Sequence, residues 1–305
     1  MEPKCPVCAN QSFRRIGKPK TNSVSNKFIR KDYYIVQCQH CKLYFVSPSI
    51  DFIDIEWAEL YNNDYFNFQS KWLVKKRGRE LSARFSKACE LLGAKKNVNF
   101  LDIGTGEGKT LLEGLKRGWN ITGIDIVDNR IPEAKNESIN FYVSKFLDCN
   151  LPENHFDFIY LDSVLEHVTN PKEYLYKIHK LLNKNGILYV GVPNEDSLFN
   201  DIRKIMFFLL RRNSISTKLK PFDNPYHVVG FNRYSLNYLF SETKLDTRLF
   251  RNFGRKFQFL ASSPKHKAFW ITLFFLLPIE FLGSVLKRDV YFEAYLGRIN
   301  NNQLK

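Results

Sequence analysis

Apolar runs alternate with helical patterns through the middle of the chain. Continuous apolar stretches that predict buried strands lie at residues 98–103, 119–125, 141–143, 156–161 and 187–192. Strands that alternate with helices imply right-handed crossovers, and hence a parallel sheet with helices on both faces. The pattern therefore predicts an α/β fold whose ligands bind at the carboxyl ends of the strands.

Glycine, asparagine and proline mark the ends of the predicted helices. A helix with apolar positions spaced over 73–92 is expected to end at Gly93, and the helix after the first strand at Gly118. Asn170, as N-cap, and Pro171 predict the start of another helix, and Gly186 is expected to close it. These boundaries place one helix after the first strand and another before the fifth.

Two apolar segments lie outside this alternation. In residues 198–212 the apolar side chains share one helical face. Residues 269–286 are almost wholly apolar, and Lys287 and Arg288 follow them. The second run is too short to predict a transmembrane helix. It favours either an interfacial segment whose cations meet anionic headgroups, or a helical cap buried on the sheet or in a dimer interface. The tail, Tyr291–Lys305, lacks the apolar pattern of a strand.

These patterns divide the chain into four regions. Residues 1–49 form a small cysteine-containing module, and residues 50–95 a helical linker or cap that begins with an aromatic-rich stretch. Residues 96–262 form the α/β domain, with a helical insertion at about 197–220. Residues 263–305 form the apolar helical segment and the tail.

The charge of the chain predicts an anionic partner. Its 46 basic and 31 acidic residues give a formal net charge of +15, which favours nucleic acid, an acidic lipid surface or a phosphorylated substrate. The alternative is a solvated basic surface with no partner. No apolar run follows Met1, so we expect no secretory signal and a cytoplasmic location.

Four cysteines form two C-x-x-C pairs, and the other two are isolated. The paired residues are Cys5, Cys8, Cys38 and Cys41. Two such turns can place four thiolates tetrahedrally around one zinc ion, which keeps a segment too small for its own core folded. A redox C-x-x-C is the alternative, but it needs a βαβ setting that is missing here. A strand at about Ile29–Val36 leads into the second pair, His40 is expected on the surface, and Cys89 and Cys149 are expected to be buried.

A glycine-rich turn follows the first strand of the α/β domain. It runs Leu-Asp-Ile-Gly-Thr-Gly-Glu-Gly over residues 101–108, and its glycines permit a tight turn that presents backbone amides to a ligand. A nicotinamide-binding turn requires Gly or Ala where this chain has Lys109. Asp125 ends the second strand, 19 positions after Gly106, where a carboxylate accepts ribose hydroxyls in nucleotide-binding folds.

The D-x-G-x-G-x-G turn resembles motif I of the class I S-adenosylmethionine-dependent methyltransferases. Three later segments are similar to those of the same family: 156–160 to its fourth strand, Leu165–Val168 to the helix start after it, and 181–194 to the region of its fifth strand. The resemblance covers about residues 73–245. It implies a Rossmann-like seven-stranded sheet with helices on both faces, carrying a small N-terminal zinc ribbon and a C-terminal apolar helical addition.

The resemblance also implies the cofactor contacts. In the family, the glycines of the turn wrap the methionine moiety, the acid before them holds its amino group, and the acid after the second strand binds the ribose. The residues after the third strand meet the adenine, and those ending the fourth strand lie near the sulfonium. The corresponding residues are Asp102, Gly104, Gly106, Gly108, Asp125, Phe146, Leu147, Leu161 and Asp162. Lys145 stands where relatives often have aspartate.

Glu166, His167 and the distant His227 form a candidate catalytic group. They resemble the Glu-His pair and distant His of metal-dependent O-methyltransferases of ubiquinone biosynthesis and of plant small RNAs, in which a divalent ion lowers the pKa of the acceptor hydroxyl. Ser163 stands where those relatives have a further glutamate, and Asp162 is the nearest carboxylate. Three interpretations remain: a histidine as general base, a divalent metal ion, or a helix-capping and packing role.

The layout of zinc knuckles followed by a methyltransferase domain resembles enzymes of bacterial surface-polysaccharide and sugar modification. It predicts methyl transfer to a hydroxyl of a glycan, sugar or lipid-linked precursor, at a peripheral site on the inner face of the membrane. One alternative is RNA methylation, with the zinc ribbon and basic surface as the docking face, which steep salt dependence of RNA binding would favour. Another is a noncatalytic membrane scaffold with a vestigial cofactor fold. The oligomeric state does not follow from the sequence.

Overall fold

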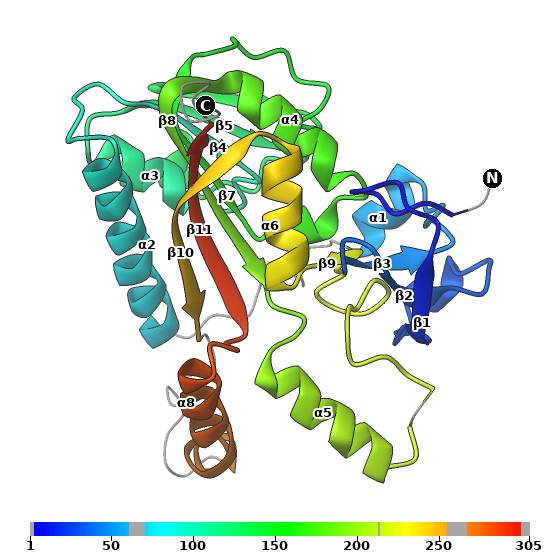
Figure 1. The fold of residues 1–305 in the computed structure, drawn as a ribbon. Coiled ribbons are helices and arrows are strands. Elements are labelled where there is room, and N and C mark those ends of the chain that lie inside the picture. The colour runs from blue at the N-terminus through cyan, green and yellow to red at the C-terminus, as the bar shows by residue number, and fades with distance from the viewer. Residues whose placement is uncertain (1–2, 61–70, 213, 255–266, 300–305) are drawn as a thin grey trace.

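The computed structural model describes residues 3–60, 71–212, 214–254 and 267–299. Within these residues the strands form a seven-stranded sheet and a four-stranded sheet (Figure 1). The strands of the large sheet are β4 (Asn99–Ile103), β5 (Asn120–Asp125), β6 (Ile139–Val143), β7 (Phe156–Asp162), β8 (Leu182–Pro193), β10 (Leu245–Phe253) and β11 (Tyr291–Arg298).

The large sheet has the order β10-β11-β8-β7-β4-β5-β6. Strands β4 to β8 are mutually parallel, whereas β11 is antiparallel to both of its neighbours. The chain runs outward from β4 through β5 to β6 and then crosses to β7, so the direction of winding reverses between β4 and β7. Ligands of open α/β sheets bind at the carboxyl ends of the strands on either side of such a reversal. The predicted α/β fold is therefore confirmed.

Helices cover both faces of the large sheet (Figure 1). One face is covered by α2 (Lys71–Leu91) and α3 (Lys109–Leu115), and the other by α4 (Pro171–Leu181) and α6 (Arg233–Glu242). On the first face, Phe85 of α2 is fully buried and its ring packs on those of Phe100, Trp119 and Phe158. Wide rings on both layers fill the space between helix and sheet, which holds the strand ends in fixed positions.

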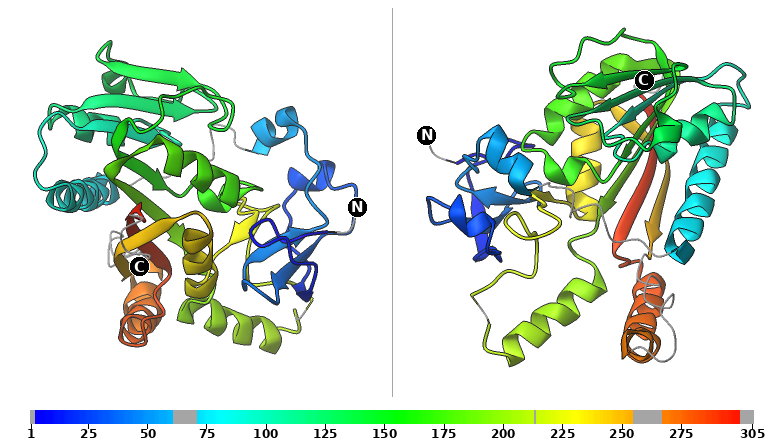
Figure 2. Two further views of the ribbon diagram at one scale, coloured as in Figure 1. Left: turned by 45° about the horizontal axis from the view of Figure 1, so that its top comes forward. Right: turned by 180° about the vertical axis from the view of Figure 1, so that it is seen from behind.

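The N-terminal module forms the small sheet. It contains β1 (Phe13–Gly17), β2 (Tyr34–Cys38) and β3 (Tyr44–Ser47), and its fourth strand is β9 (Val229–Gly230), which pairs antiparallel with β3. The expected strand at 29–36 therefore begins later, at Tyr34. Two isolated bridges, Lys18 to Ile215 and Thr21 to Phe222, join the module to the loop before β9. The module and the 215–231 segment thus form one packed unit (Figure 2).

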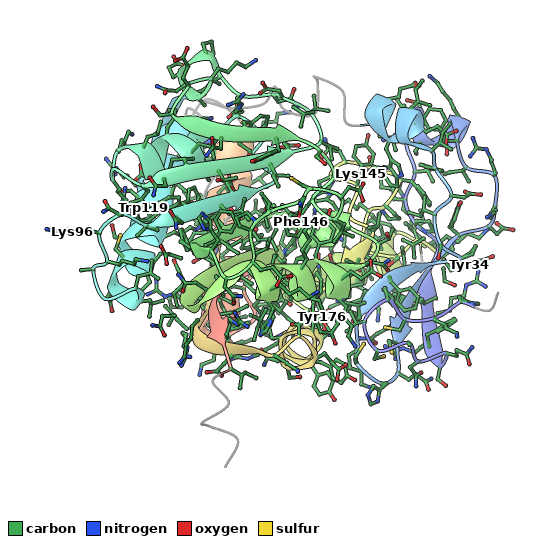
Figure 3. All side chains as sticks on the ribbon, turned by 90° about the horizontal axis from the view of Figure 1, so that it is seen from above. Tyr34, Lys96, Trp119, Lys145, Phe146 and Tyr176 are labelled. Carbon is green, nitrogen blue, oxygen red and sulfur yellow. The ribbon has the colours of Figure 1, made fainter. Side chains whose placement is uncertain are left out.

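The module faces the carboxyl ends of the parallel strands. Figure 3 shows Lys96 and Trp119, which precede β4 and β5, at the side of the large sheet away from the module. Lys145 and Phe146, which follow β6, lie on the side toward Tyr34 of the module. The small sheet therefore lies beside the edge where this fold class binds its ligands.

Two helical segments project from the end of the large sheet (Figure 1). One is α5 (Leu198–Leu209), and the other runs through α7 (Lys267–Ile271), a π-helical turn (Thr272–Leu276) and α8 (Leu277–Val285). They contact each other where Leu198 donates its backbone N–H to the carbonyl of Arg288, at 3.0 Å. In the described residues, no helix combines the length and the hydropathy needed to cross a bilayer. Shorter elements are α1 (Asp54–Leu60) and the 3-10 turns Ser25–Lys27, Pro132–Ala134 and Leu165–His167, the last labelled η4 here.

Two expectations about element boundaries are wrong. Tyr291–Arg298 is a strand, β11, inserted between β8 and β10 with seven of its eight residues buried. Gly186 does not end a helix: α4 passes directly into β8, and Gly186 lies in that strand where an added Cβ would meet the Phe156 carbonyl at 2.8 Å. The helix start expected at Asn170 and Pro171 is confirmed, although the Asn170 side chain donates to Glu173 and makes no capping bond.

The apolar residues of 198–212 and 269–286 do not form a cap buried on the sheet. Helix α5 has no buried residue, and only Thr272, Glu280 and Gly283 are buried along the second segment as described. The helix that begins at Leu198 ends at Leu209. The aromatic-rich stretch at 61–70, the boundary at 262–263 and the last residues of the tail lie outside the described residues.

Candidate functional site

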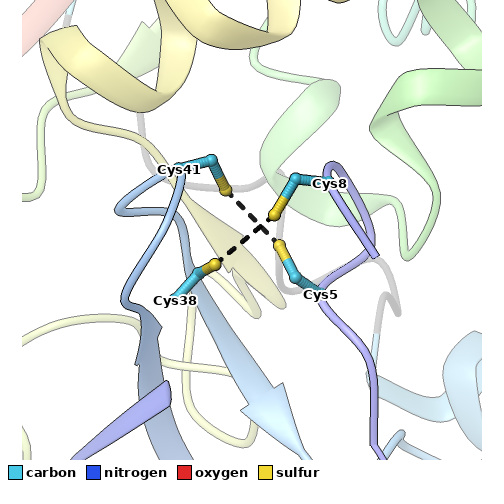
Figure 4. Close-up of side chains that lie close together, drawn as sticks. All are labelled: Cys5, Cys8, Cys38 and Cys41. Atoms are coloured by element: carbon cyan, nitrogen blue, oxygen red, sulfur yellow. Dashed lines mark hydrogen bonds between the residues drawn. The ribbon is translucent and has the colours of Figure 1, made fainter. Parts of the chain in front are cut away.

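The four paired cysteines converge on one point (Figure 4). The Sγ atoms of Cys5 and Cys41 lie 3.4 Å apart and those of Cys8 and Cys38 lie 3.5 Å apart, and all four lie within 4.8 Å of one another. Four thiolates at about 2.3 Å from one ion would be separated by about 3.8 Å. The thiols are free, and Cys41 lowers the pKa of Cys5 to about 5 by hydrogen bonding to it. The donor set and its spacing fit a structural zinc ion.

The other cysteines and His40 lie apart from this cluster. Cys149 is buried, as expected, whereas Cys89 is partly exposed. His40 is exposed, and its Nε2 lies 3.3 Å from the hydroxyl of Tyr238. The surface position expected for His40 is therefore confirmed.

The glycine turn lies at the carboxyl end of β4. Gly104, Gly106 and Gly108 all have positive φ angles, of 77°, 54° and 79°. An added Cβ would meet Val164 at Gly104 and Ala134 at Gly108, but at Gly106 it would meet nothing within 4 Å. The first and third glycines therefore permit close packing inside the protein, and the second lines open space beside the strand ends.

Two carboxylates adjoin this turn. Asp125 ends β5, and its Oδ2 accepts the backbone N–H of Gly106 at 2.7 Å while its Oδ1 accepts that of Ile126 at 2.7 Å. Asp102 lies in β4, is almost fully buried and accepts a hydrogen bond from the hydroxyl of Thr110. Burial raises the pKa of Asp102 to about 7. A cation beside Asp102 would favour its ionised form.

The residues predicted to meet adenine differ in exposure. Phe146 is buried, and its ring packs against that of Tyr174 with centroids 5.2 Å apart. Its carbonyl accepts a hydrogen bond from Lys177 at 2.6 Å. Leu147 and Lys145 are more exposed, and Lys145 lies beside the strand ends (Figure 3). Phe146 fixes this loop against α4, and Leu147 is left to form a surface.

The two residues at the end of β7 have different environments. The side chain of Leu161 is fully buried in the core, which leaves only its backbone for a ligand. Asp162 accepts hydrogen bonds from Arg84 at 3.0 Å and from the Tyr291 hydroxyl at 2.6 Å. Arg84 of α2 is buried and also donates to Glu293 at 2.7 Å. The orientation of Asp162 is therefore fixed by a helix and by β11.

Glu166, His167 and His227 come together beside the ends of β7 and β8. One ligand atom from each lies within 4.8 Å of the others, and His227 Nε2 is 3.9 Å from Glu166 Oε1. The two imidazole rings meet edge to face, with centroids 4.9 Å apart. Burial lowers the pKa of His167 to about 4, and burial, His167 and Lys220 hold the pKa of His227 well below its usual range. Both imidazoles are therefore neutral near pH 7.

His227 reaches this position through backbone pairing. The Val228 N–H donates to the Glu166 carbonyl at 2.8 Å, which ties the segment before β9 to the turn η4. The next two residues form β9 and pair with β3 of the N-terminal module. His227 is therefore held between the large sheet and the cysteine-containing module, 60 positions after its neighbour His167.

Several residues around the site were not predicted. Arg84 and Tyr291 orient Asp162, and Thr110 bonds Asp102. Thr110 lies eight positions after Asp102, at the start of the helix that follows the glycine turn. That position in the sequence could have indicated its contact with Asp102. Arg84 lies at the spacing of the apolar positions Leu81, Phe85 and Ala88, but a charged residue in a helix is ordinarily assigned to the surface.

The strand order, the glycine turn after β4 and the acid that ends β5 define the class I methyltransferase fold. A family model described as a methyltransferase domain matches residues 73–254. The match covers more than half of the chain, and the chain belongs to this family.

Solved structures share the fold at low sequence identity. A 1,6-didemethyltoxoflavin-N1-methyltransferase from Burkholderia thailandensis, solved with S-adenosylhomocysteine, aligns with a TM-score of 0.51 and 16% identity, over 90% of this chain and 98% of that one. The [4+2]-cyclase SpnF aligns with a TM-score of 0.51 and 14% identity, over 75% of this chain and 84% of that one. At these identities the likeness concerns the fold alone.

Curated relatives match over shorter segments. A demethylmenaquinone methyltransferase from Tropheryma whipplei is 29% identical over 107 residues, 34% of this chain and 45% of its own length. A ubiquinone biosynthesis O-methyltransferase from Pelagibacter ubique is 30% identical over 105 residues, 33% of this chain and 44% of its own. An uncharacterised protein from Methanocaldococcus jannaschii is 29% identical over 98 residues, which are 32% of this chain and 45% of its own length. The chain thus spans less than half the length of each of these relatives.

Proposed function

We propose that the chain transfers a methyl group from S-adenosylmethionine to a hydroxyl of its acceptor. The observation that carries the proposal is the convergence of the open Gly106 turn, Asp102 and Asp125 with a pair of neutral histidines at the same sheet edge. The family membership supports it, as does the similarity to a ubiquinone biosynthesis O-methyltransferase from Pelagibacter ubique.

The proposed cofactor contacts follow the positions of the residues. Asp125 binds the ribose hydroxyls, and the buried Asp102 binds the methionine amino group as an ion pair. Gly104, Gly106 and Gly108 bring the backbone close to the methionine moiety. Adenine lies against the loop of Phe146 and Leu147, while Leu161, through its backbone, and Asp162 border the sulfonium. We assign the adenine contact to the side chain of Leu147, because the ring of Phe146 is already packed on that of Tyr174.

The reaction is a direct displacement. S-adenosylmethionine supplies the methyl group: the acceptor oxygen bonds to the methyl carbon as the carbon–sulfur bond breaks, and the thioether S-adenosylhomocysteine leaves. The hydroxyl proton passes to a neutral imidazole, His227 or His167, with Glu166 at 3.9 Å from His227 Nε2 to stabilise the cation formed. The protein's main contribution is alignment of the two reacting atoms.

A divalent ion is the second candidate for activation of the hydroxyl, because the ligand atoms of Glu166, His167 and His227 lie within 4.8 Å of one another. These three residues would hold the ion, and the ion would lower the pKa of an acceptor hydroxyl bound to it. Methyl transfer by protein treated with EDTA, compared with the same protein resupplied with Mg²⁺ or Mn²⁺, separates the two: loss and recovery support the ion, and unchanged turnover supports the histidine base. Because EDTA also threatens a zinc site, the zinc content of each sample is measured.

For the N-terminal module we propose one structural zinc ion held by Cys5, Cys8, Cys38 and Cys41. The ion would fix the two knuckles and, through β3, the β9 strand next to His227. Mass spectrometry under native conditions should find one zinc ion per chain, and a zinc-free protein with an unchanged circular dichroism spectrum would contradict the assignment.

The proposed acceptor is a glycan, sugar or lipid-linked precursor, met at an anionic membrane surface. Apolar side chains protrude from α5 and from the α7–α8 segment, and the most exposed are Ile205, Phe208, Leu209, Phe274, Phe275, Phe281 and Val285. Arg211, Arg212 and Lys287 flank them. Apolar side chains inserted between lipid headgroups, with cations beside them, suit an anionic bilayer.

Flotation with vesicles tests the membrane proposal. Phe275→Ser with Phe281→Ser should reduce binding to vesicles containing phosphatidylglycerol at least about tenfold, since burial of each ring contributes about 2 kcal/mol or more. Val143→Ser, an exposed apolar residue on β6, is the matched control. Equal binding by the double variant and by Val143→Ser would refute the role of the α7–α8 segment.

Calorimetric titration with S-adenosylmethionine tests the proposed function itself. Binding by the wild type, lost in Asp125→Ala, supports the cofactor site and justifies acceptor screening with glycolipids and RNA. A folded, zinc-loaded wild type that does not bind would overturn the enzymatic function and favour a scaffold.

A further inference from the structure

His227 also forms part of the wall of a small cavity. It has a volume of about 160 Å³ and is lined by Asn194 after β8, Arg203 of α5, and Lys220 and His227 from the loop before β9, among others. Cavities that enclose a whole small-molecule ligand measure roughly 300–1,000 Å³. This one is therefore sized for a single group of a larger molecule.

The cavity carries more positive than negative charge. The Nε of Arg203 is buried and has no hydrogen-bond partner among the residues that the structure describes. Burial lowers the pKa of Arg203, and burial together with Arg203 lowers the pKa of Lys220, so the two cations are near enough to repel each other. The carboxylate in the lining is that of Glu195, whose Oε2 already accepts from Asn200 at 3.2 Å and from the Leu219 N–H at 3.4 Å.

Asp223 also acts on Lys220, but that carboxylate is paired with Lys20 at 2.7 Å. The two cations of the lining against its one carboxylate therefore leave a surplus positive charge that an anion would neutralise. A buried cation without a partner is costly, and a buried N–H donor without an acceptor adds to the cost. The planar guanidinium offers a fork of N–H donors that matches carboxylate or phosphate oxygens, and the ammonium of a lysine adds a compact second charge. An oxyanion between the guanidinium and the ammonium would balance the charge and accept a hydrogen bond from the buried N–H.

We propose that this cavity binds an anionic group of the methyl acceptor, a carboxylate or a phosphate, between Arg203 and Lys220. The acceptor hydroxyl is then placed against His227, which forms part of the same wall. The placement of the hydroxyl rests on the proposed function, whereas anion binding by the cavity is independent of it. The substrate class is thus narrowed to hydroxyl compounds that carry a carboxylate or phosphate near the methylated position.

Anion titration of the zinc-loaded 305-residue chain, saturated with S-adenosylhomocysteine, tests the proposal without turnover. The probes are inorganic phosphate, followed by ³¹P NMR line broadening, and ¹³C-labelled acetate, followed by ¹³C NMR. Arg203→Leu and, as a second variant, Lys220→Met should each weaken binding at least about tenfold, because each removes charged hydrogen bonds. Lys204→Leu is the matched control, since it removes the same charge from the neighbouring position on α5 outside this cavity.

The outcomes are distinct. Saturable binding of phosphate, of acetate or of both, weakened in the two variants and unchanged in Lys204→Leu, supports the site, and the tighter probe identifies the anionic group. Equal weakening in all three variants would assign the binding to net charge and overturn the proposal, as would the absence of saturable binding of either probe by the wild type. Thermal unfolding of each variant confirms that it is folded. Calorimetry with S-adenosylmethionine shows separately whether the cofactor site stands, so failure of one proposal is not mistaken for failure of the other.

Discussion

The raised pKa of Asp102 makes cofactor binding depend on pH. Burial raises this pKa to about 7, so the empty protein holds a neutral carboxyl group at pH 5. The proposed ion pair with the methionine amino group requires the carboxylate. The amino group itself remains cationic below pH of about 7.7. Binding in this window should therefore release a proton from Asp102.

The size of the effect follows from the ionised fraction. With a pKa of about 7, roughly 1% of Asp102 is ionised at pH 5 and about half at pH 7, so affinity should rise by about 50-fold between them and little more above. The sign for stability is opposite. The folded-state pKa lies above the unfolded value of 3.8, so the free energy of unfolding of the cofactor-free protein falls as pH rises from about 4 to 7, by at most about 4 kcal/mol.

Calorimetric titration in two buffers of different ionisation enthalpy measures the protons released. Near pH 6 we expect close to one proton per cofactor bound, and in Asp102→Asn close to none, with affinity that is weak and independent of pH. His167 and His227 should contribute little, since burial lowers the pKa of His167 to about 4 and holds that of His227 well below its usual range. A wild-type affinity that is flat from pH 5 to 7, with no proton released, would refute the ion pair.

Three further predictions concern the structure that holds the site. Cys38→Ser should lose the bound zinc, measured by mass spectrometry, and lower the unfolding temperature; full zinc occupancy would contradict the four-thiolate site. Arg84→Met leaves Glu293 buried without its cation, so urea titration should show a loss of about 3–5 kcal/mol, and a loss below about 1 kcal/mol would contradict the network. Gly104→Ala forces a Cβ to within 2.5 Å of a valine at a φ of 77°, which should lower both stability and cofactor affinity, whereas Gly78→Ala, with open space around it, should stabilise by up to about 1 kcal/mol.

The central sheet was predictable because its parallel strands are buried on both faces. Such strands are continuous apolar runs, and those of β4, β5 and β7 were located to within one residue. Strand β11 was not predicted, because a charged residue interrupts its apolar run. It carries Glu293 in the core, where Arg84 from a distant helix pairs with it, and a buried ion pair resembles a surface sequence until both partners are known.

The candidate site was predictable where its residues are neighbours of a strand end. The glycine turn, Asp125 and Glu166 with His167 all follow this rule. The position of His227 was inferred from resemblance, since its approach to Glu166 depends on a β9 of only two residues paired with a strand far away in the sequence. Nothing in the sequence indicated a site at Arg203 and Lys220, because the cavity between them exists only after α5 and the loop before β9 have folded together.

The pairing of β3 with β9 has a consequence for the order of folding during synthesis. The last strand of the small sheet leaves the ribosome about 180 residues after β3, which at 5–20 residues per second is a delay of roughly 10–40 s. Through that interval the emerging N-terminal segment has three strands with an unprotected edge, and its thiols are exposed to oxidation. Early metal capture by those thiols would keep the unfinished module folded until its final strand arrives with His227, the histidine proposed for the reaction.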